Sequence, residues 1–166
     1  MKNNLKWIII AAVVVIVIVV GVVLLIPQNE YRDDISSKEL ILVGNNSFST
    51  DGGTYENDED KILDFTVEQT VGLIDYKIIK ANNAKNINEI GVFHVENGNV
   101  TDYQKLVQEY VANLQASYRN MNYLPEETEK IYCAKVKVFG NYIVYSFLNE
   151  NDTDAFYQSI ENELTK

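Results

Sequence analysis

The chain has 166 residues, of which 24 are acidic and 14 basic, so its formal net charge is −10. This excess of acid argues against nucleic-acid binding and against flat binding to anionic lipid, because both need clusters of Lys and Arg. The single cysteine, Cys133, excludes an intrachain disulfide. We expect it to be a small buried apolar side chain rather than a reactive thiol.

An apolar run without any charged side chain covers residues 8–26. A helix of this length measures about 28 Å at about 1.5 Å per residue, close to the hydrocarbon thickness of a bilayer. We therefore predict a transmembrane anchor over residues 7–27, with residues 8–26 in contact with the lipid bilayer. A cleaved signal peptide is the alternative, but this run is longer than a signal core and no small-x-small cleavage site follows Pro27.

The charges on either side of the run predict its orientation. Lys2 and Lys6 precede it, and the positive-inside rule therefore places residues 1–6 in the cytoplasm. All 24 acidic and the remaining 12 basic residues follow the run, so that part of the chain carries a formal charge of −12. We expect a single-pass protein of the cell membrane whose C-terminal part lies outside.

Residues 28–60 are rich in Asn, Ser, Gly and acidic side chains and are predicted to form a flexible acidic spacer. One apolar island, residues 39–43, interrupts this stretch. We interpret it as a short helix or strand that docks on the following domain.

Two strands and a long helix are predicted next. Residues 75–80 and 90–95 are apolar segments separated by an Asn-rich turn, a pattern typical of paired strands. Residues 101–121 predict a helix because apolar side chains recur at spacings of three and four. Thr101 and Gln104 have the spacing of a capping box at its start.

A hairpin and a last helix complete the chain. Residues 131–139 and 142–148 are predicted strands, joined by a tight turn at Gly140 and Asn141. Residues 154–164 predict a helix with one apolar side.

The order strand, strand, helix, strand, strand, helix over residues 61–166 predicts the fold class. This ββαββα order favours an extracytoplasmic α+β domain with an antiparallel sheet of about four strands and helices on one face. Because no disulfide is available, the domain must be held by its own apolar core.

Several of these segments carry a resemblance to a known family. They are residues 89–93, 114–115, 123–127, 136–138 and 140–144. Over roughly residues 61–164 the chain resembles the family of domain of unknown function 4358. The resemblance implies a small bacterial extracytoplasmic protein, held by a lipid or by an N-terminal helix, although this chain lacks the lipobox cysteine of the commoner members. The family has no assigned activity or catalytic residue, so none is transferred to this chain.

No pattern of catalytic or metal-binding residues is found. His94, the only histidine, lies in a predicted strand and points away from the side of Phe93 and Val95, with no nucleophile paired to it. One His and one Cys exclude the usual zinc sites. The oxygen-rich segments 51–53 and 149–154 lack the EF-hand pattern, and we expect both to be solvated loops. The alternative is that these loops bind calcium. We predict no catalytic residue, no metal and no cofactor.

Tyrosine is frequent, with 11 residues against one Trp. Tyr110 and Tyr118 lie in the apolar stripe of the long helix and are expected in the core. Tyr123, Tyr132 and Tyr142 are the candidate partner-binding surface, because exposed aromatic side chains bind proteins and sugars. The alternative is that these three pack in the core with their hydroxyl groups reaching water.

The anchor, the spacer and the missing catalytic set favour a non-enzymatic binding or interaction module at the bacterial cell surface. An envelope protein or a wall glycan is the expected partner. The alternative is a cell-wall hydrolase that uses paired carboxylates, which the number of acidic residues leaves open because sequence does not give their separation in space.

Overall fold

The computed structural model describes residues 31–45, 54–56, 65, 67–81, 85–119 and 124–166. Residues 31–166 form a compact unit of their own. The predicted cytoplasmic segment, residues 1–6, and the predicted anchor, residues 7–27, lie outside the described residues. Among the residues that are described, no helix is both long and apolar enough to cross a bilayer.

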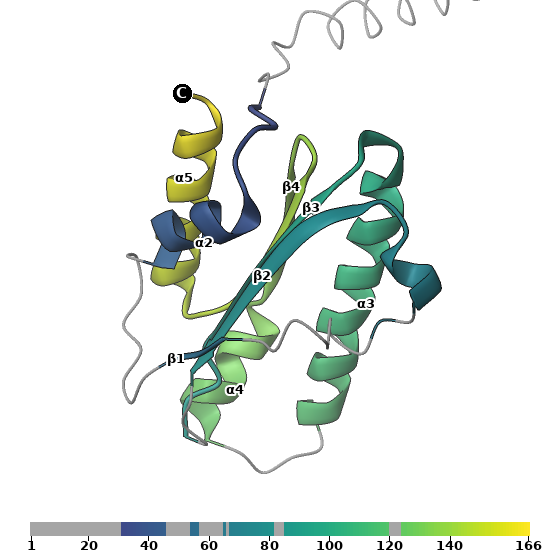
Figure 1. Ribbon diagram of the computed structural model, residues 1–166. Coiled ribbons are helices and arrows are strands. Elements are labelled where there is room, and N and C mark those ends of the chain that lie inside the picture. Colours follow the sequence, from purple (N-terminus) through teal and green to yellow (C-terminus); the bar gives the residue numbers. More distant parts are fainter. Residues whose placement is uncertain (1–30, 46–53, 57–64, 66, 82–84, 120–123) are drawn as a thin grey trace, which may run out of the picture. The chain divides into compact units, whose positions relative to one another are not determined.

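The structure combines helices with an antiparallel sheet whose strands follow one another in pairs, which confirms the α+β class (Figure 1). In chain order they are α2 (Ser37–Asn45), β1 (Thr54–Glu56), the 3₁₀ turn η1 (Val67–Thr70), β2 (Leu73–Ala81), β3 (Glu89–Val95), the 3₁₀ turn η2 (Asn97–Asn99), α3 (Val100–Arg119), α4 (Pro125–Tyr132), β4 (Lys135–Phe139), β5 (Tyr142–Phe147) and α5 (Glu150–Leu164).

The strands form one antiparallel sheet in the order β1-β2-β3-β5-β4. Four of them are the predicted strands, and β1 adds a strand of three residues at the edge beside β2. The two-residue turn at Gly140 and Asn141 joins β4 to β5 as expected, with Gly140 at a positive φ of 57°. In the centre of the sheet Gly91 lies opposite Tyr145, and His94 lies opposite Tyr142.

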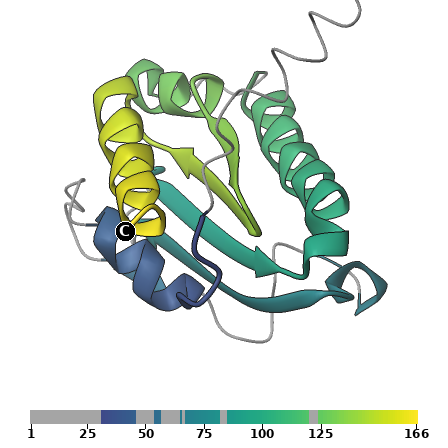
Figure 2. The same cartoon turned by 90° about the horizontal axis from the view of Figure 1, so that it is seen from above.

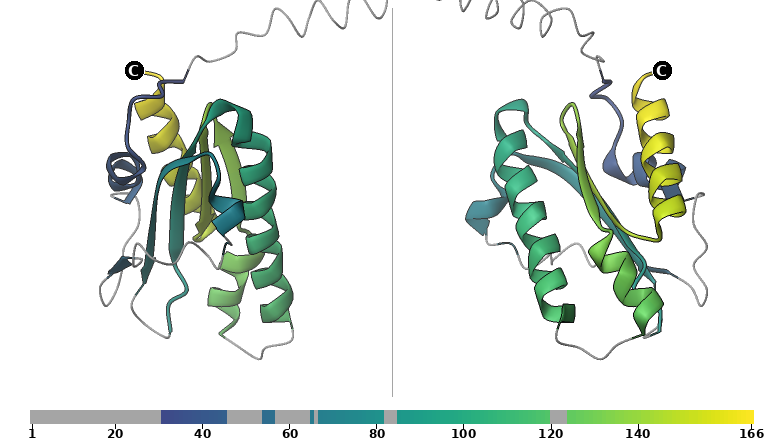
Figure 3. Two further views of the ribbon diagram at one scale, coloured as in Figure 1. Left: turned by 45° about the vertical axis from the view of Figure 1, so that its right-hand side comes forward. Right: turned by 180° about the vertical axis from the view of Figure 1, so that it is seen from behind.

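Helices cover both faces of the sheet, so the expectation of helices on one face is wrong. Figure 2 and the left view of Figure 3 show α2 and α5 on one side of the sheet and α3 and α4 on the other. The reason lies in β3 and β5, in which every residue is buried. Strands that are apolar on both faces need a layer on each side. Two separate core clusters result, one under α2 and α5 and one under α3 and α4.

The N-terminal part of the predicted spacer belongs to the folded unit. Ile35, Leu40 and Ile41 are buried in the core under α5. The Tyr142 hydroxyl accepts a hydrogen bond from the Ile35 N–H (3.2 Å) and donates one to the Ile35 carbonyl (2.7 Å). The folded unit thus begins at Tyr31 instead of residue 61, and the apolar island is helix α2. The sequence did not indicate this early start, because Ile35, Leu40 and Ile41 stand in a stretch of mostly polar residues, although all three face the same core.

The predicted ββαββα order is wrong in two places. Helix α2 and strand β1 precede the first predicted strand, and α4 lies between α3 and β4. Ile131, which we assigned to a strand, lies on α4 and is buried under α3. Pro125 occupies the first turn of α4, where its missing N–H leaves no hydrogen bond unmade. The capping residue that the structure shows on the last helix is Asn149, whose side chain accepts a hydrogen bond from the Asp152 N–H (2.9 Å).

Candidate functional site

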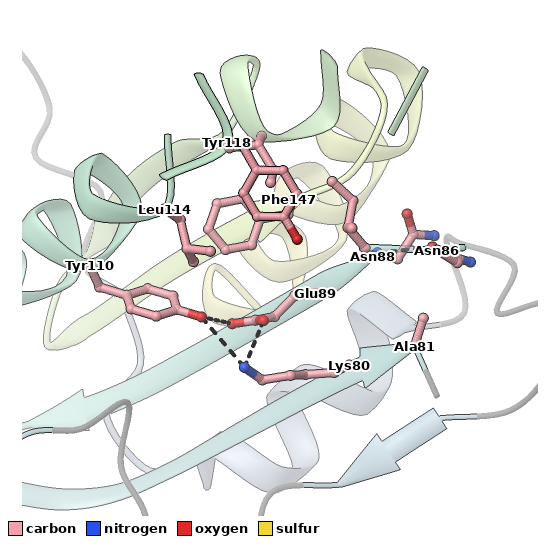
Figure 4. A pocket seen from close by; sticks show the side chains of 11 residues that line it. Lys80, Ala81, Asn86, Asn88, Glu89, Tyr110, Leu114, Tyr118 and Phe147 are labelled. Carbon is pink, nitrogen blue, oxygen red and sulfur yellow. Dashed lines mark hydrogen bonds and ion pairs between the residues drawn. The ribbon is translucent and has the colours of Figure 1, made fainter. Parts of the chain in front are cut away.

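A pocket of about 260 Å³ lies between the sheet and α3, and we call it the Lys80 pocket (Figure 4). Its polar side consists of side chains at the facing ends of β2 and β3 and on α3, and its apolar side comes from α3, α4 and β5. The polar residues are Lys80, Asn86, Asn88, Glu89 and Tyr110. The apolar wall includes Leu114, Tyr118, Ile131 and Phe147.

The Glu89 carboxylate is the centre of the polar side. Its Oε1 atom accepts hydrogen bonds from the hydroxyls of Tyr110 (2.7 Å) and Tyr145 (2.5 Å). Its Oε2 atom forms an ion pair with the Lys80 Nζ atom (2.9 Å). Figure 4 shows Lys80, Glu89 and Tyr110 converging from three different elements. The Glu89 side chain is 9% exposed and the Lys80 side chain 41% exposed, so solvent reaches the lysine far more than the carboxylate.

The Tyr145 hydroxyl is a permanent donor to this carboxylate. Burial, followed by the nearby Glu89 charge, raises the pKa of Tyr145 well above its ordinary value. Room for the ring is made by Gly91 on the neighbouring strand, because a Cβ atom there would lie 2.1 Å from a Tyr145 ring carbon. Gly91 therefore permits the tyrosine that orients Glu89.

A second buried carboxylate lies on α4, where it fixes the chain segment that precedes β3. The Glu127 Oε2 atom accepts a hydrogen bond from the Ile87 N–H (2.9 Å), and its Oε1 atom pairs with the Lys130 Nζ atom (2.7 Å). Ile87 also lines the Lys80 pocket. Each of these two buried acids thus has its own lysine and its own hydrogen-bond donors.

Two further pockets continue from the Lys80 pocket along α3. The first, of about 440 Å³, shares Tyr110 and Leu114 with it. The second, of about 580 Å³, shares Gln69, Leu106 and Glu109 with the first. We call the three pockets together the α3 trough. It extends along α3 from Tyr118 to Asn99, the residue that precedes the helix. Residues that line it beyond the Lys80 pocket include Phe65, Gln69, Asn99, Leu106, Asn113 and Ser117.

The predicted partner surface of Tyr123, Tyr132 and Tyr142 is not formed as expected. Tyr142 is fully buried in the core under α2 and α5, because its strand is covered on that face. Tyr132 is 46% exposed at the end of α4, and Tyr123 lies outside the described residues. Tyr110 and Tyr118 are partly buried against the core under α3 and also line the Lys80 pocket.

His94 joins β3 to the N-terminal segment. Its ring stacks on that of Tyr142, with centroids 4.4 Å apart, and its Nε2 atom lies 2.7 Å from the Asp33 Oδ1 atom. The Asp33 Oδ2 atom in turn accepts a hydrogen bond from the Asn141 side chain (2.9 Å). These contacts hold residues 31–35 on the sheet, which is a structural role.

The remaining candidate positions are distributed over the molecule. Cys133 is half-buried and follows α4, whereas we expected it buried in a strand. The segment 149–154 caps and begins α5, and the segment 51–53 lies outside the described residues. Within the described part of the chain, no group of three or more His, Cys, Asp or Glu side chains is arranged to hold a metal ion.

One pattern in the sequence could have indicated the polar side of the Lys80 pocket. Lys80 and Glu89 are opposite each other in the β2–β3 register, at the ends of two strands that we predicted to be neighbours. A lysine and a glutamate on either side of a hairpin turn are candidates for a cross-strand ion pair. The contributions of Tyr110 and Tyr145 depend on how α3 crosses the sheet, which periodicity does not indicate.

Comparison with known proteins gives one match. A family model described as domain of unknown function (DUF4358) matches residues 54–148, from β1 to the end of β5. No curated protein and no solved structure matches the chain. The matched region contains Lys80, Glu89, Tyr110 and Tyr145, but not α2 or α5.

Proposed function

The chain belongs to the family of domain of unknown function 4358, and from this premise we propose that it is a non-enzymatic binding module held outside the bacterial membrane. The Lys80 pocket is its binding site. The N-terminal apolar run, residues 8–26, supplies the membrane anchor, with the N-terminus in the cytoplasm.

One observation carries this proposal: the Glu89 carboxylate at the centre of the pocket's polar side has partners on both oxygens and is held in place before any ligand arrives. Tyr110, Tyr145 and Lys80 together occupy both oxygens of Glu89. A rigid array of this kind lowers the entropic cost of binding, because its side chains are already ordered. It presents Lys80, which is partly exposed, together with the half-buried amide of Asn86 as hydrogen-bonding groups beside an apolar wall.

The alternative of a hydrolase with paired carboxylates requires two acids that face a bound substrate and its attacking water. The two buried acids described near the pocket, Glu89 and Glu127, already pair with Lys80 and Lys130. A substrate would have to displace these partners before either carboxylate acted on it. Binding requires no such rearrangement, and we therefore favour it.

Photo-crosslinking in cells tests the proposal. A photoreactive residue at position 86, at the mouth of the pocket, is expected to give a discrete adduct with an envelope component that mass spectrometry identifies. The matched control is the same residue at Gln158, which is exposed on α5 on the other side of the sheet. An adduct of the same composition and yield at both positions, or no adduct at position 86, would overturn the proposal.

A further inference from the structure

We propose that the ligand is a linear, uncharged glycan that lies along the α3 trough, with one end in the Lys80 pocket. This inference rests on the proposed binding function and specifies its ligand class. It follows from the length of the trough, from the chemistry of its lining and from its charge.

The length of the trough indicates a polymer. The three pockets share lining residues, Tyr110 and Leu114 at one junction and Leu106 and Glu109 at the other, so they form a row. They accompany α3, whose 20 residues extend about 30 Å at about 1.5 Å per residue. A single small molecule fills the 260 Å³ of the Lys80 pocket but leaves the other two empty. A chain of repeated units of similar size occupies all three.

The lining matches the two kinds of surface that a sugar ring presents. Sugar hydroxyls need side chains that both donate and accept hydrogen bonds, and the amides of Asn86, Asn99 and Asn113 do both. The C–H faces of a sugar ring pack on flat or branched apolar side chains, which Tyr118 and Leu106 provide at separate points along the row.

The charge of the trough argues against charged polymers. Two lysines and three acids line it, Lys80 and Lys105 against Glu89, Asp102 and Glu109. An anionic polymer would meet no surplus of cations there, on a chain whose net charge is already −10. The trough is close to neutral by comparison with the chain, and this favours an uncharged ligand.

A peptide ligand fits the trough less well. Extended peptides are bound most often by pairing with the free edge of a sheet. In the described part of the chain the edge strands of the sheet are β1 and β4. The trough instead follows the side chains of a helix, which offers an incoming peptide no backbone groups to pair with.

Calorimetry with oligomers of N-acetylglucosamine tests the inference on the full-length chain in detergent micelles. The hexamer is expected to bind about tenfold more tightly than the dimer, because only the longer chain occupies the whole row. Two variants test the contacts: Lys80→Met at one end and Asn113→Ala in the middle. Each is expected to weaken binding of the hexamer about tenfold.

Matched controls lie on the other side of the sheet. Lys137→Met removes a lysine whose Nζ atom lies 4.7 Å from the centroid of the Tyr157 ring, and Asn151→Ala removes an exposed amide on α5. Both variants are expected to bind the hexamer like the unaltered chain. Equal losses in test and control variants would overturn the inference, as would equal affinity for dimer and hexamer or binding of neither. If position 86 crosslinks to a protein or peptide while no oligosaccharide binds, the glycan inference fails and the binding function stands.

Discussion

The two faces of the sheet are built differently from the same strands. Under α2 and α5 the core is one apolar cluster, and its two tyrosine hydroxyls bond to the backbone, that of Tyr142 to Ile35 and that of Tyr157 to Lys135. Under α3 and α4 the core gives way at one end to the ion pair between the partly exposed Lys80 and the buried Glu89, and to the α3 trough. One layer thus supplies stability, and the other combines stability with a surface that can receive a ligand.

The two faces differ because the helices on them pack with different closeness. Helix α5 packs so closely on α2 that a Cβ at Gly44 would lie 2.3 Å from the ring of Phe156. Helix α3, by contrast, keeps Tyr110 and Leu114 only partly buried, and both line pockets. Substitutions on the two sides should therefore affect different properties, and the comparison can be tested.

The largest effect is expected from removing the N-terminal segment. A chain that begins at Lys61 lacks Ile35, Leu40 and Ile41 from the core under α5. Burial of such side chains contributes about 1.5–3 kcal/mol each, so the loss is about 5 kcal/mol or more. We expect this fragment not to unfold cooperatively in urea, whereas a fragment that begins at Tyr31 does. Cooperative unfolding of both fragments with equal midpoints would show that α2 is dispensable.

Single leucines compare the two layers directly. Leu40→Ala on α2 leaves a cavity in a fully buried site and is expected to lower the free energy of unfolding by about 2–5 kcal/mol. Leu114→Ala on α3 truncates a partly buried wall of the trough and is expected to lower it by about 1 kcal/mol. Urea titration measures both values. A larger loss for Leu114→Ala would contradict the division between the layers.

The two central tyrosines of β5 separate stability from binding. Tyr145→Phe removes a donor from the Glu89 carboxylate, and Tyr142→Phe removes the hydroxyl that bonds to Ile35. Each is expected to lower the free energy of unfolding by about 1–3 kcal/mol. Only Tyr145→Phe should also weaken binding of the N-acetylglucosamine hexamer, since only this hydroxyl orients the pocket. Weaker binding by Tyr142→Phe alone would place the site on the wrong face.

The smallest effect at neutral pH comes from ionisation of the buried Tyr103 and Tyr142 hydroxyls, which occurs only in alkali. Burial raises the pKa of Tyr103 and of Tyr142 to about 12, against an ordinary value of about 10 in the unfolded chain. Between these values the unfolded state releases protons that the folded state keeps, so the free energy of unfolding falls as the pH rises from about 10 to about 12. Below pH 10 this contribution is constant.

Tyr103→Phe provides the control for the alkaline effect. The Tyr103 hydroxyl is buried and has no hydrogen-bond partner in the described structure, so its removal is expected to leave stability unchanged or to raise it by about 1 kcal/mol at pH 7. The decline of stability above pH 10 should become shallower in this variant, as measured by urea titration at a series of pH values. An unchanged decline would mean that Tyr103 does not contribute to it.

Much of the fold could be predicted from local patterns. The strands at 75–80 and 90–95, the long helix and the hairpin turn at Gly140 and Asn141 all rest on periodicity and turn chemistry, and these act between neighbours in the chain. Helix α4 was missed because its eight residues are mostly polar, and its last two, Ile131 and Tyr132, were assigned to the strand that follows.

The site was missed for a different reason. Lys80 and Glu89 face each other across a predicted hairpin, and this pair was within reach of sequence reasoning. Tyr110 and Tyr145 join them from elements that are distant in the chain, and no spacing in the sequence brings their hydroxyls to one carboxylate. The predicted partner surface of tyrosines was wrong for the same reason. Tyr142 is buried because a helix covers its face of the sheet, and the sequence does not indicate this.

By itself, the sequence determined the α+β class, the main strands and the long helix, because hydrophobic periodicity and turn residues act locally. Only the tertiary structure decided that residues 31–45 complete the core, that both faces of the sheet are covered, and that Glu89 meets its three partners. Those outcomes depend on side chains that are far apart in the chain and close in space, where burial and the pairing of buried charges decide the arrangement.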